Sequence, residues 1–296
     1  MKFSGHFSGP AVIIHGGVNL RRVEGDEAKQ NASVISDILK ESWAMLGAGK
    51  RAVDVVCRAV EMLENEPCFN AGRGAAIQSD GSVKLSASLM DGTRERFSGV
   101  NLASHLINPS KLARLLQEKE DRVLGPLGAQ LVARELGIPP ENPITAKQAR
   151  KWLKEIEKRE AVEKTGTVGA VVCDAQGRLA AATSTGGRSF EYPDRMSDVG
   201  SVAGNYASEY SAISCTGIGE QIIDAALAPR IDTRVRDGKT IIDASNITFD
   251  EADKKKQLYG WIGIDHDSNW VIYYTTETIA AGIISASHER PFIATD

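Results

Sequence analysis

Residues 166–187 read GTVGAVVCDAQGRLAAATSTGG and carry the clearest structural signal in the chain. Two runs rich in valine and alanine, 167–173 and 178–185, flank the turn sequence Asp-Ala-Gln-Gly at 174–177. Apolar runs of this length around a glycine-containing turn are typical of a β-hairpin. The stretch therefore predicts two neighbouring, buried strands.

The chain on both sides of this hairpin predicts a mixed α/β protein. Apolar residues at three- and four-residue spacing predict helices over 27–47 and 51–64. Short apolar runs predict strands at 11–15, 75–78, 83–90, 212–215, 261–264 and 270–275. We expect the first to end in a turn at Gly16-Gly17, and the second and third to form a hairpin. The whole chain, 1–296, is expected to be one domain of the α/β (α+β) class with mainly antiparallel sheets.

A highly charged segment precedes the hairpin. Seven basic and four acidic residues lie between positions 146 and 164, and Trp152 and Ile156 give the segment only a thin apolar side. A helix with so little apolar surface has little to bury. We therefore expect residues 145–166 to form an exposed linker.

Composition limits the partners and the location. The 35 Lys and Arg against 39 Asp and Glu give a net charge of −4, which argues against nucleic acid because phosphate binding needs a basic face. No apolar run is long enough to span a membrane. Four separated cysteines without a Cys-x-x-Cys motif, and no visible signal peptide, predict a cytoplasmic protein with reduced thiols.

Two cofactor classes are not expected. The five histidines are dispersed and none forms a His-x-x-x-His pair, so no metal site is predicted. Gly217-Ile218-Gly219 follows a strand, but the third glycine of a dinucleotide fingerprint is replaced by Ile222. Gly217-Ile218-Gly219 is therefore either a tight turn or a segment whose backbone N–H groups face a negative charge that develops during a reaction.

Gly166-Thr167 has two interpretations. Threonine is common where a strand starts, and glycine is common in turns. Alternatively, the chain is cut between them, which gives Thr167 a free α-amine beside its hydroxyl. The amine can then act as the base that activates the hydroxyl as a nucleophile.

Polar residues that follow favour the second interpretation. The hydroxyls of Thr183, Ser184 and Thr185 end the partner strand and can lie beside Thr167. Arg195 and Asp198 are three residues apart. An arginine fork binds a carboxylate and an aspartate accepts from an ammonium, so the pair can hold an α-amino acid. The alternative is a surface salt bridge between them.

At these residues the sequence resembles the plant-type asparaginase and isoaspartyl aminopeptidase family of N-terminal nucleophile hydrolases. The resemblance runs over nearly the whole chain, in ordered blocks. These are His15-Gly16-Gly17, Phe69-Asn70-Ala71-Gly72-x-Gly74, Ala87–Gly92, Asn108-Pro109, Gly166–Val171, Ala181–Gly187 and Ser214–Glu220.

The resemblance implies a four-layer αββα sandwich and a chain that cleaves itself into residues 1–166 and 167–296. Two cleaved units are expected to pair as a homodimer. By resemblance, Thr167 is the nucleophile and Thr185 supports it, Thr216 and Gly217 form the oxyanion hole, Arg195 and Asp198 bind the α-carboxylate and α-ammonium, Gly219 holds the amine, and Asn70 is structural. No cofactor is expected, although the family often holds a structural Na⁺ or K⁺.

The implied function is hydrolysis of L-asparagine or β-aspartyl peptides through a β-aspartyl enzyme ester. Glycosylasparaginase activity is an alternative within the class, and a non-hydrolytic module that binds an amino acid or a protein is an alternative outside it. The sequence departs from the family pattern at four places. These are Ser86-Ala87-Ser88, Met196-Ser197, Gly204–Ala207 and Thr275–Ala280.

Overall fold

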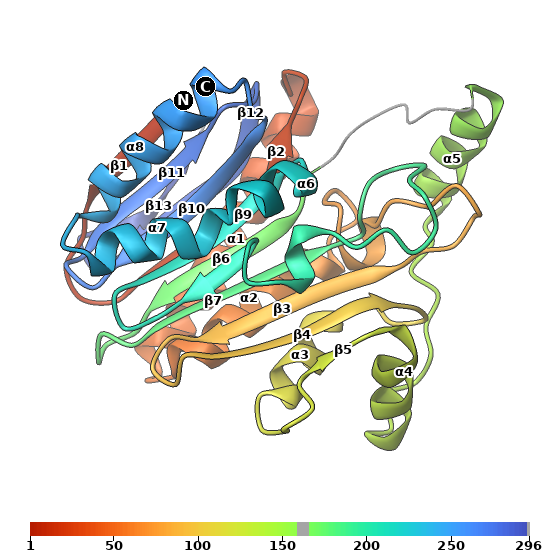
Figure 1. The fold of residues 1–296 in the computed structure, drawn as a ribbon, viewed down its shortest axis with the longest axis horizontal. Coiled ribbons are helices and arrows are strands. Elements are labelled where there is room, and N and C mark those ends of the chain that lie inside the picture. Colours follow the sequence, from red (N-terminus) through yellow and green to blue (C-terminus); the bar gives the residue numbers. More distant parts are fainter. Residues whose placement is uncertain (159–165, 295–296) are drawn as a thin grey trace.

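The computed structural model describes residues 1–158 and 166–294, which form two stacked β-sheets covered by helices (Figure 1). The five-stranded sheet has the order β1-β11-β10-β9-β8. Its strands are β1 (Lys2–His6), β11 (Asn269–Tyr274), β10 (Tyr259–Asp265), β9 (Ser211–Gly217) and β8 (Asn205–Ala207). Every pairing in it is antiparallel.

The eight-stranded sheet has the order β13-β12-β2-β6-β7-β3-β4-β5. Its strands are β13 (His288–Ala294), β12 (Thr278–Ser285), β2 (Ala11–Asn19), β6 (Val168–Cys173), β7 (Leu179–Thr185), β3 (Leu85–Asp91), β4 (Arg96–Ala103) and β5 (Val123–Leu124). Only the short β5 pairs in parallel, with β4. The hairpin predicted from 166–187 is confirmed as β6 and β7, at the centre of this sheet.

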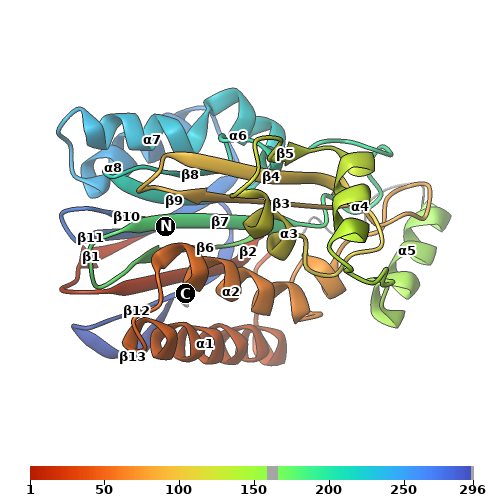
Figure 2. The ribbon, with the colours of Figure 1, turned by 90° about the horizontal axis from the view of Figure 1, so that it is seen from below.

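Helices cover the outer face of each sheet, as Figure 2 shows from the side. The eight-stranded sheet packs against α1 (Gly25–Gly47), α2 (Ala52–Asn65), α3 (Pro109–Leu116) and α4 (Pro126–Glu135). The five-stranded sheet packs against α7 (Leu227–Arg236) and α8 (Ile241–Lys254), with α6 (Gly219–Ala225) at its end. The expected four-layer αββα sandwich of antiparallel sheets is confirmed.

Strand β6 shows why its sequence is a continuous apolar run. Val168, Ala170 and Val172 pack toward the helices, whereas Val171 and Cys173 pack between the sheets. Because successive side chains of a strand point to opposite faces, a strand buried on both faces needs apolar residues at every position.

Two predictions about local structure are wrong. Residues 75–78 are not a strand, because the Ala76 amide donates to Asn70 Oδ1 and the Gln78 amide closes a turn on Ser82. Strand β3 pairs with β4 and β7 instead. Gly16-Gly17 is not a turn either, since β2 continues to Asn19. The pairing with β12 is irregular there, and Gly17 adopts a φ of +105° that glycine tolerates.

The charged segment forms helix α5 (Ala146–Lys158). Glu155 is buried and accepts a hydrogen bond from Ser189, and Trp152 Nε1 donates to the Gln78 carbonyl at 2.8 Å. This helix is therefore attached to the loops beside it. Residues 159–165 lie outside the described residues, so the exposed linker over 145–166 stays a prediction.

Candidate active site

Thr167 immediately precedes β6, at the junction of the two sheets. Val168 pairs with Ser184, so the register of the hairpin places Thr167 opposite Thr185. The Thr167 side chain is only 6% exposed, and its backbone nitrogen donates to Thr216 Oγ1 at 3.1 Å. Thr167 before β6, Thr185 at the end of β7 and Thr216 in β9 are thus brought to one place.

The residue before the predicted cleavage site has no room for a side chain. A Cβ on Gly166 would lie 2.5 Å from the Val18 nitrogen and 2.8 Å from Thr216 Oγ1. A Cβ on Gly17 would in turn lie 2.8 Å from the Gly166 carbonyl carbon. The Gly166–Thr167 bond is therefore held tightly against the end of β2, and only glycine fits at position 166.

The hydroxyl of Thr216 has a defined role at the end of β9. Its oxygen accepts from the Thr167 nitrogen at 3.1 Å and from the Val18 nitrogen at 3.3 Å. A hydroxyl group that already accepts two hydrogen bonds still has its proton to donate to a third partner, such as a substrate oxygen. Gly217 follows with a φ of +137°, and a Cβ there would lie 2.5 Å from the Tyr259 Cα.

Asn70 holds the loop that follows β7. Its side-chain nitrogen donates to the Gly187 carbonyl at 2.6 Å, and its backbone carbonyl accepts from the Gly186 nitrogen at 3.0 Å. The Gly187 nitrogen donates to Thr185 Oγ1 at 3.1 Å. Asn70 therefore orients the loop that fixes the Thr185 hydroxyl.

Arg195 pairs with carboxylates that the sequence did not indicate as partners. Its Nε and one terminal nitrogen bind the two oxygens of Glu220 at 2.8 and 2.7 Å, and the other terminal nitrogen lies 3.2 Å from Glu191. Burial lowers the pKa of Arg195, but Glu220, Glu191 and Asp198 together raise it. The guanidinium thus stays charged although its side chain is only 12% exposed.

Asp198 is buried beside this arginine without forming an ion pair with it. Its side chain lies against the backbones of Gly204 and Gly219, each of which has no Cβ to occupy that space. Asp198 Oδ2 has no hydrogen-bond partner in the described part of the chain. Burial raises the pKa of Asp198 to about 7, although Arg195 opposes that rise. An unpaired buried carboxylate suits an incoming ammonium group.

These contacts bear on the prediction that Arg195 and Asp198 together hold an α-amino acid. The alternative of a surface salt bridge between the two is not what the structure shows, because Asp198 is 2% exposed and Arg195 pairs elsewhere. A Cβ on Gly219 would lie 2.7 Å from Arg195 and 2.8 Å from Asp198. Both charged groups thus meet at the start of α6, next to Gly217.

The acidic limb of the pH–rate profile, in which kcat/KM falls as the pH is lowered, tests the role of Asp198. Because burial raises its pKa to about 7, we expect kcat/KM to fall about tenfold per pH unit below pH 7. The folded pKa exceeds the ordinary value of 3.8. This carboxyl therefore contributes stability below about pH 4, and that contribution is lost as the pH rises to about 7.

Asp198→Asn is the matching variant. It should remove the acidic limb, lower kcat/KM by roughly 100-fold, and raise the melting temperature of the ligand-free protein at pH 8. A pH–rate profile and thermal scans at pH 5 and pH 8 check this. An acidic limb that persists in the variant would assign the titration to another group.

A buried polar chain beneath Thr167 was missed from the sequence. His15 Nε2 lies 3.0 Å from Ser214 Oγ, which lies 2.7 Å from Thr183 Oγ1. Burial lowers the pKa of His15 to about 3, partly offset by the nearby backbone of Thr167. His15 is therefore neutral at physiological pH. The one sequence signal for this chain is Gly169, where a Cβ would lie 2.0 Å from Ser214 Oγ.

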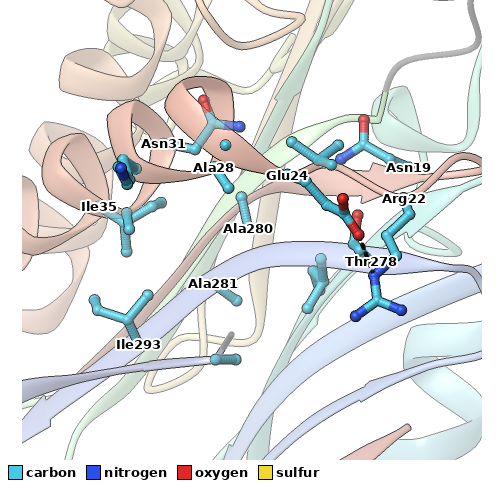
Figure 3. A pocket seen from close by; sticks show the side chains of 16 residues that line it. Asn19, Arg22, Glu24, Ala28, Asn31, Ile35, Thr278, Ala280, Ala281 and Ile293 are labelled. Carbon is cyan, nitrogen blue, oxygen red and sulfur yellow. Dashed lines mark ion pairs between the residues drawn. The ribbon is translucent and has the colours of Figure 1, made fainter. Parts of the chain in front are cut away.

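Two cavities differ in whether the side chains that line them include predicted site residues. The first, of about 340 Å³, lies between α1 and strands β12 and β13, and Figure 3 shows Ala28 and Ile35 on one side and Ala280 and Ile293 on the other. It contains none of the predicted site residues. The second, of about 380 Å³, lies between the loop at 67–70 and α5, and Asn70 lines it.

Residues 1–158 and 166–294 contain neither a cluster of metal-ligating side chains nor a membrane-spanning helix. No group of three or more His, Cys, Asp or Glu side chains in these ranges is placed to hold a metal ion. No helix in the same ranges is both long and apolar enough to cross a bilayer.

The fold and the site together define an N-terminal nucleophile hydrolase arrangement, with a threonine at the start of a central strand. Residues 8–293 match the asparaginase family, and the chain belongs to that family. It is 42% identical over 274 residues to a protein of Nostoc sp. named isoaspartyl peptidase/L-asparaginase, covering 86% of each chain.

Two further relatives carry the same name. The protein from Synechocystis sp. is 40% identical over 88% of this chain and 83% of its own length. The protein from Rattus norvegicus is 36% identical over 90% of this chain and 84% of its own length.

Proposed function

We propose that this protein is a threonine hydrolase that cleaves itself before Thr167 and then hydrolyses L-asparagine and β-aspartyl peptides. The observation that carries the proposal is that Thr167 is buried beside Thr216, while Asp198, whose Oδ2 is unpaired in the described part of the chain, lies by Gly219, three residues after Thr216. The names of the relatives, isoaspartyl peptidase/L-asparaginase, support the same substrates.

Self-cleavage is an N-to-O acyl shift followed by hydrolysis. The Thr167 hydroxyl oxygen attacks the Gly166 carbonyl carbon, the C–N bond breaks, and the hydroxyl proton goes to the departing nitrogen. Water then hydrolyses the ester and releases the Gly166 carboxylate. The products are residues 1–166 and a second segment, 167–296, that begins with Thr167.

Hydrolysis of the substrate uses the same hydroxyl, with the new α-amine of Thr167 as base. Arg195 binds the α-carboxylate of the aspartyl group, while Asp198 and the Gly219 carbonyl bind its α-ammonium. The Thr216 hydroxyl and the Gly217 backbone stabilise the oxyanion, for which the loss of one donor typically costs about 100- to 1,000-fold. The leaving amine takes the proton, and water resolves the β-aspartyl ester.

The proposal extends to assembly and location. The cleaved units pair as a homodimer, and the chemistry needs no cofactor. A structural Na⁺ or K⁺ stays a prediction. The four cysteines are free thiols, which supports a cytoplasmic location because reduced cysteines are usual there.

A substrate comparison on the cleaved protein tests the function. We expect ammonia from L-asparagine and free leucine from β-aspartyl-leucine, and little release from a glycosylated asparagine. Amino-acid chromatography measures each product. If cleaved, folded protein binds aspartate in calorimetry but leaves all three substrates intact, the binding-module alternative replaces the hydrolase.

A further inference from the structure

The cavity between helix α1 and the eight-stranded sheet measures about 340 Å³, and we call it the α1 cavity. Its volume is within the range of small-molecule sites, about 300–1,000 Å³. Small side chains leave this space, because Ala28 and Ala32 of α1 lie opposite Ala280 of β12. Two residues further along β12, a Cβ on Gly282 would lie 3.0 Å from Leu39 of α1. The helix and the sheet are therefore in close contact there, and the space is open only beside the N-terminal half of α1.

The α1 cavity and the predicted active site lie on opposite faces of the eight-stranded sheet. Ala280 packs with the helices, whereas Ile279 packs between the sheets. Because successive side chains of a strand point to opposite faces, Thr278 shares the face of Ala280 and points toward α1. By the same alternation Thr167 shares the face of Val171, which packs between the sheets. A ligand in the α1 cavity is thus distinct from a substrate at Thr167.

Two polar atoms in the wall of the α1 cavity have no hydrogen-bond partner. Thr278 is only 9% exposed, and its Oγ1 forms no hydrogen bond within residues 1–158 and 166–294. Asn31 Oδ1 of α1 is also unpaired in those ranges. A buried polar atom without a partner is costly, and most such atoms in folded proteins are paired. The two atoms therefore favour a ligand that carries hydrogen-bonding groups.

The α1 cavity has a charged end and an apolar end, as Figure 3 shows. Arg22, Glu24 and Thr278 lie on one side, and Ile35 and Ile293 lie on the other. Arg22 Nε lies 2.9 Å from Glu24 Oε1, and the two side chains are 64% and 73% exposed. Because an exposed ion pair is weak, each of these charges can also bind a ligand group. A ligand with a single charge would meet one like charge here, whereas a zwitterion meets an opposite charge for each of its own.

We propose that the α1 cavity binds a free apolar α-amino acid, such as leucine. The carboxylate of the ligand accepts from the Thr278 hydroxyl and from Arg22, and its ammonium group donates to Glu24. Its side chain lies among the alanines of the wall and contacts Ile35 and Ile293. This site goes beyond the proposed function, because it uses none of the residues assigned to hydrolysis and involves no covalent step.

Titration of the cleaved protein with L-leucine, followed by calorimetry and saturation-transfer NMR, tests the site. We expect a dissociation constant of about 1 mM, the scale for a ligand of roughly nine heavy atoms. Three matched compounds each lack one part of leucine: 4-methylpentanoate the ammonium, 3-methylbutylamine the carboxylate, and glycine the side chain. Each should bind at least about fivefold more weakly. Equal affinity for leucine and 4-methylpentanoate would overturn the ligand class, and no binding of leucine at about 10 mM would overturn the site.

Variants of the wall locate the binding. Ala280→Leu fills the space and should weaken leucine binding by about tenfold or more. The matched control Ala175→Leu lies in the exposed turn between β6 and β7 and should bind leucine normally. Thr278→Val keeps the shape of the side chain and removes its hydroxyl, so it should weaken binding by about three- to tenfold. This second variant decides the question if Ala280→Leu does not fold, and unchanged affinity in it would overturn the assigned contact.

Two further variants separate the α1 cavity from the substrate site, which also binds amino-acid groups in the proposed function. Arg195→Ala should leave the affinity for leucine unchanged. If leucine binding is lost in Arg195→Ala and retained in Ala280→Leu, leucine occupies the substrate site and the inference is overturned. Thr167→Ala should bind leucine although it hydrolyses nothing, so failure of the proposed hydrolysis and failure of this site are measured independently.

Discussion

Thr167→Ala is expected to yield a folded chain that stays at 31.8 kDa, whereas the unaltered protein converts to fragments of about 18 and 14 kDa, in proportion to their lengths. The substitution removes the hydroxyl oxygen that attacks the Gly166 carbonyl in the proposed cleavage. Hydrolysis should fall by roughly 10⁴-fold or more, as for other nucleophile deletions. Intact mass and N-terminal sequencing, which should read Thr-Val-Gly-Ala-Val for the new end, measure the first effect.

The variant should fold because the contacts that hold this position are made by the backbone. The Thr167 nitrogen keeps its bond to Thr216 Oγ1, and the glycines around Gly166 are unchanged. Thr167→Ser is the matched control, since it retains a hydroxyl and should still be cleaved. Normal cleavage of the alanine variant would show that Thr167 is not the nucleophile.

Arg195→Ala is expected to lower kcat/KM by roughly 100- to 1,000-fold while self-cleavage proceeds normally. The variant loses the guanidinium that is proposed to bind the substrate carboxylate and that Glu220 engages in this structure. It also leaves Glu220 and Glu191 facing that carboxylate without the cation that now neutralises them. Cleavage is spared because the Gly166–Thr167 bond presents no free α-carboxylate. Steady-state kinetics on L-asparagine, together with intact mass, measure both effects.

Arg188→Ala is the control for this prediction. Arg188 lies 3.8 Å from Glu191 and 3.5 Å from Glu220, but its side chain is 39% exposed, so its loss should cost less than tenfold. Glu191 stays anchored without Arg195, since Gln78 Nε2 and the Arg188 nitrogen donate to it at 3.0 and 2.9 Å. If Arg195→Ala also blocks cleavage, Arg195 has a structural role.

The predictions that depend on the longest and most regular local patterns were confirmed. The hairpin of β6 and β7 could be predicted because its apolar strand residues and its turn residues are adjacent in the sequence. Helices α1 and α2 followed from one apolar stripe each. Helices α7 and α8 were not predicted, and β4 was also missed, although it follows its partner β3 in a hairpin.

Of the site, the sequence by itself determined which residue types are available: a glycine–threonine junction, hydroxyls at the end of its partner strand, and an arginine and aspartate three residues apart. Only the tertiary structure decided what these groups contact. Arg195 binds Glu220, 25 positions away, and Asp198 is unpaired because Gly204 and Gly219 allow it to be buried. The energy of a charge depends on its surroundings in space, and those come from segments that no local pattern relates.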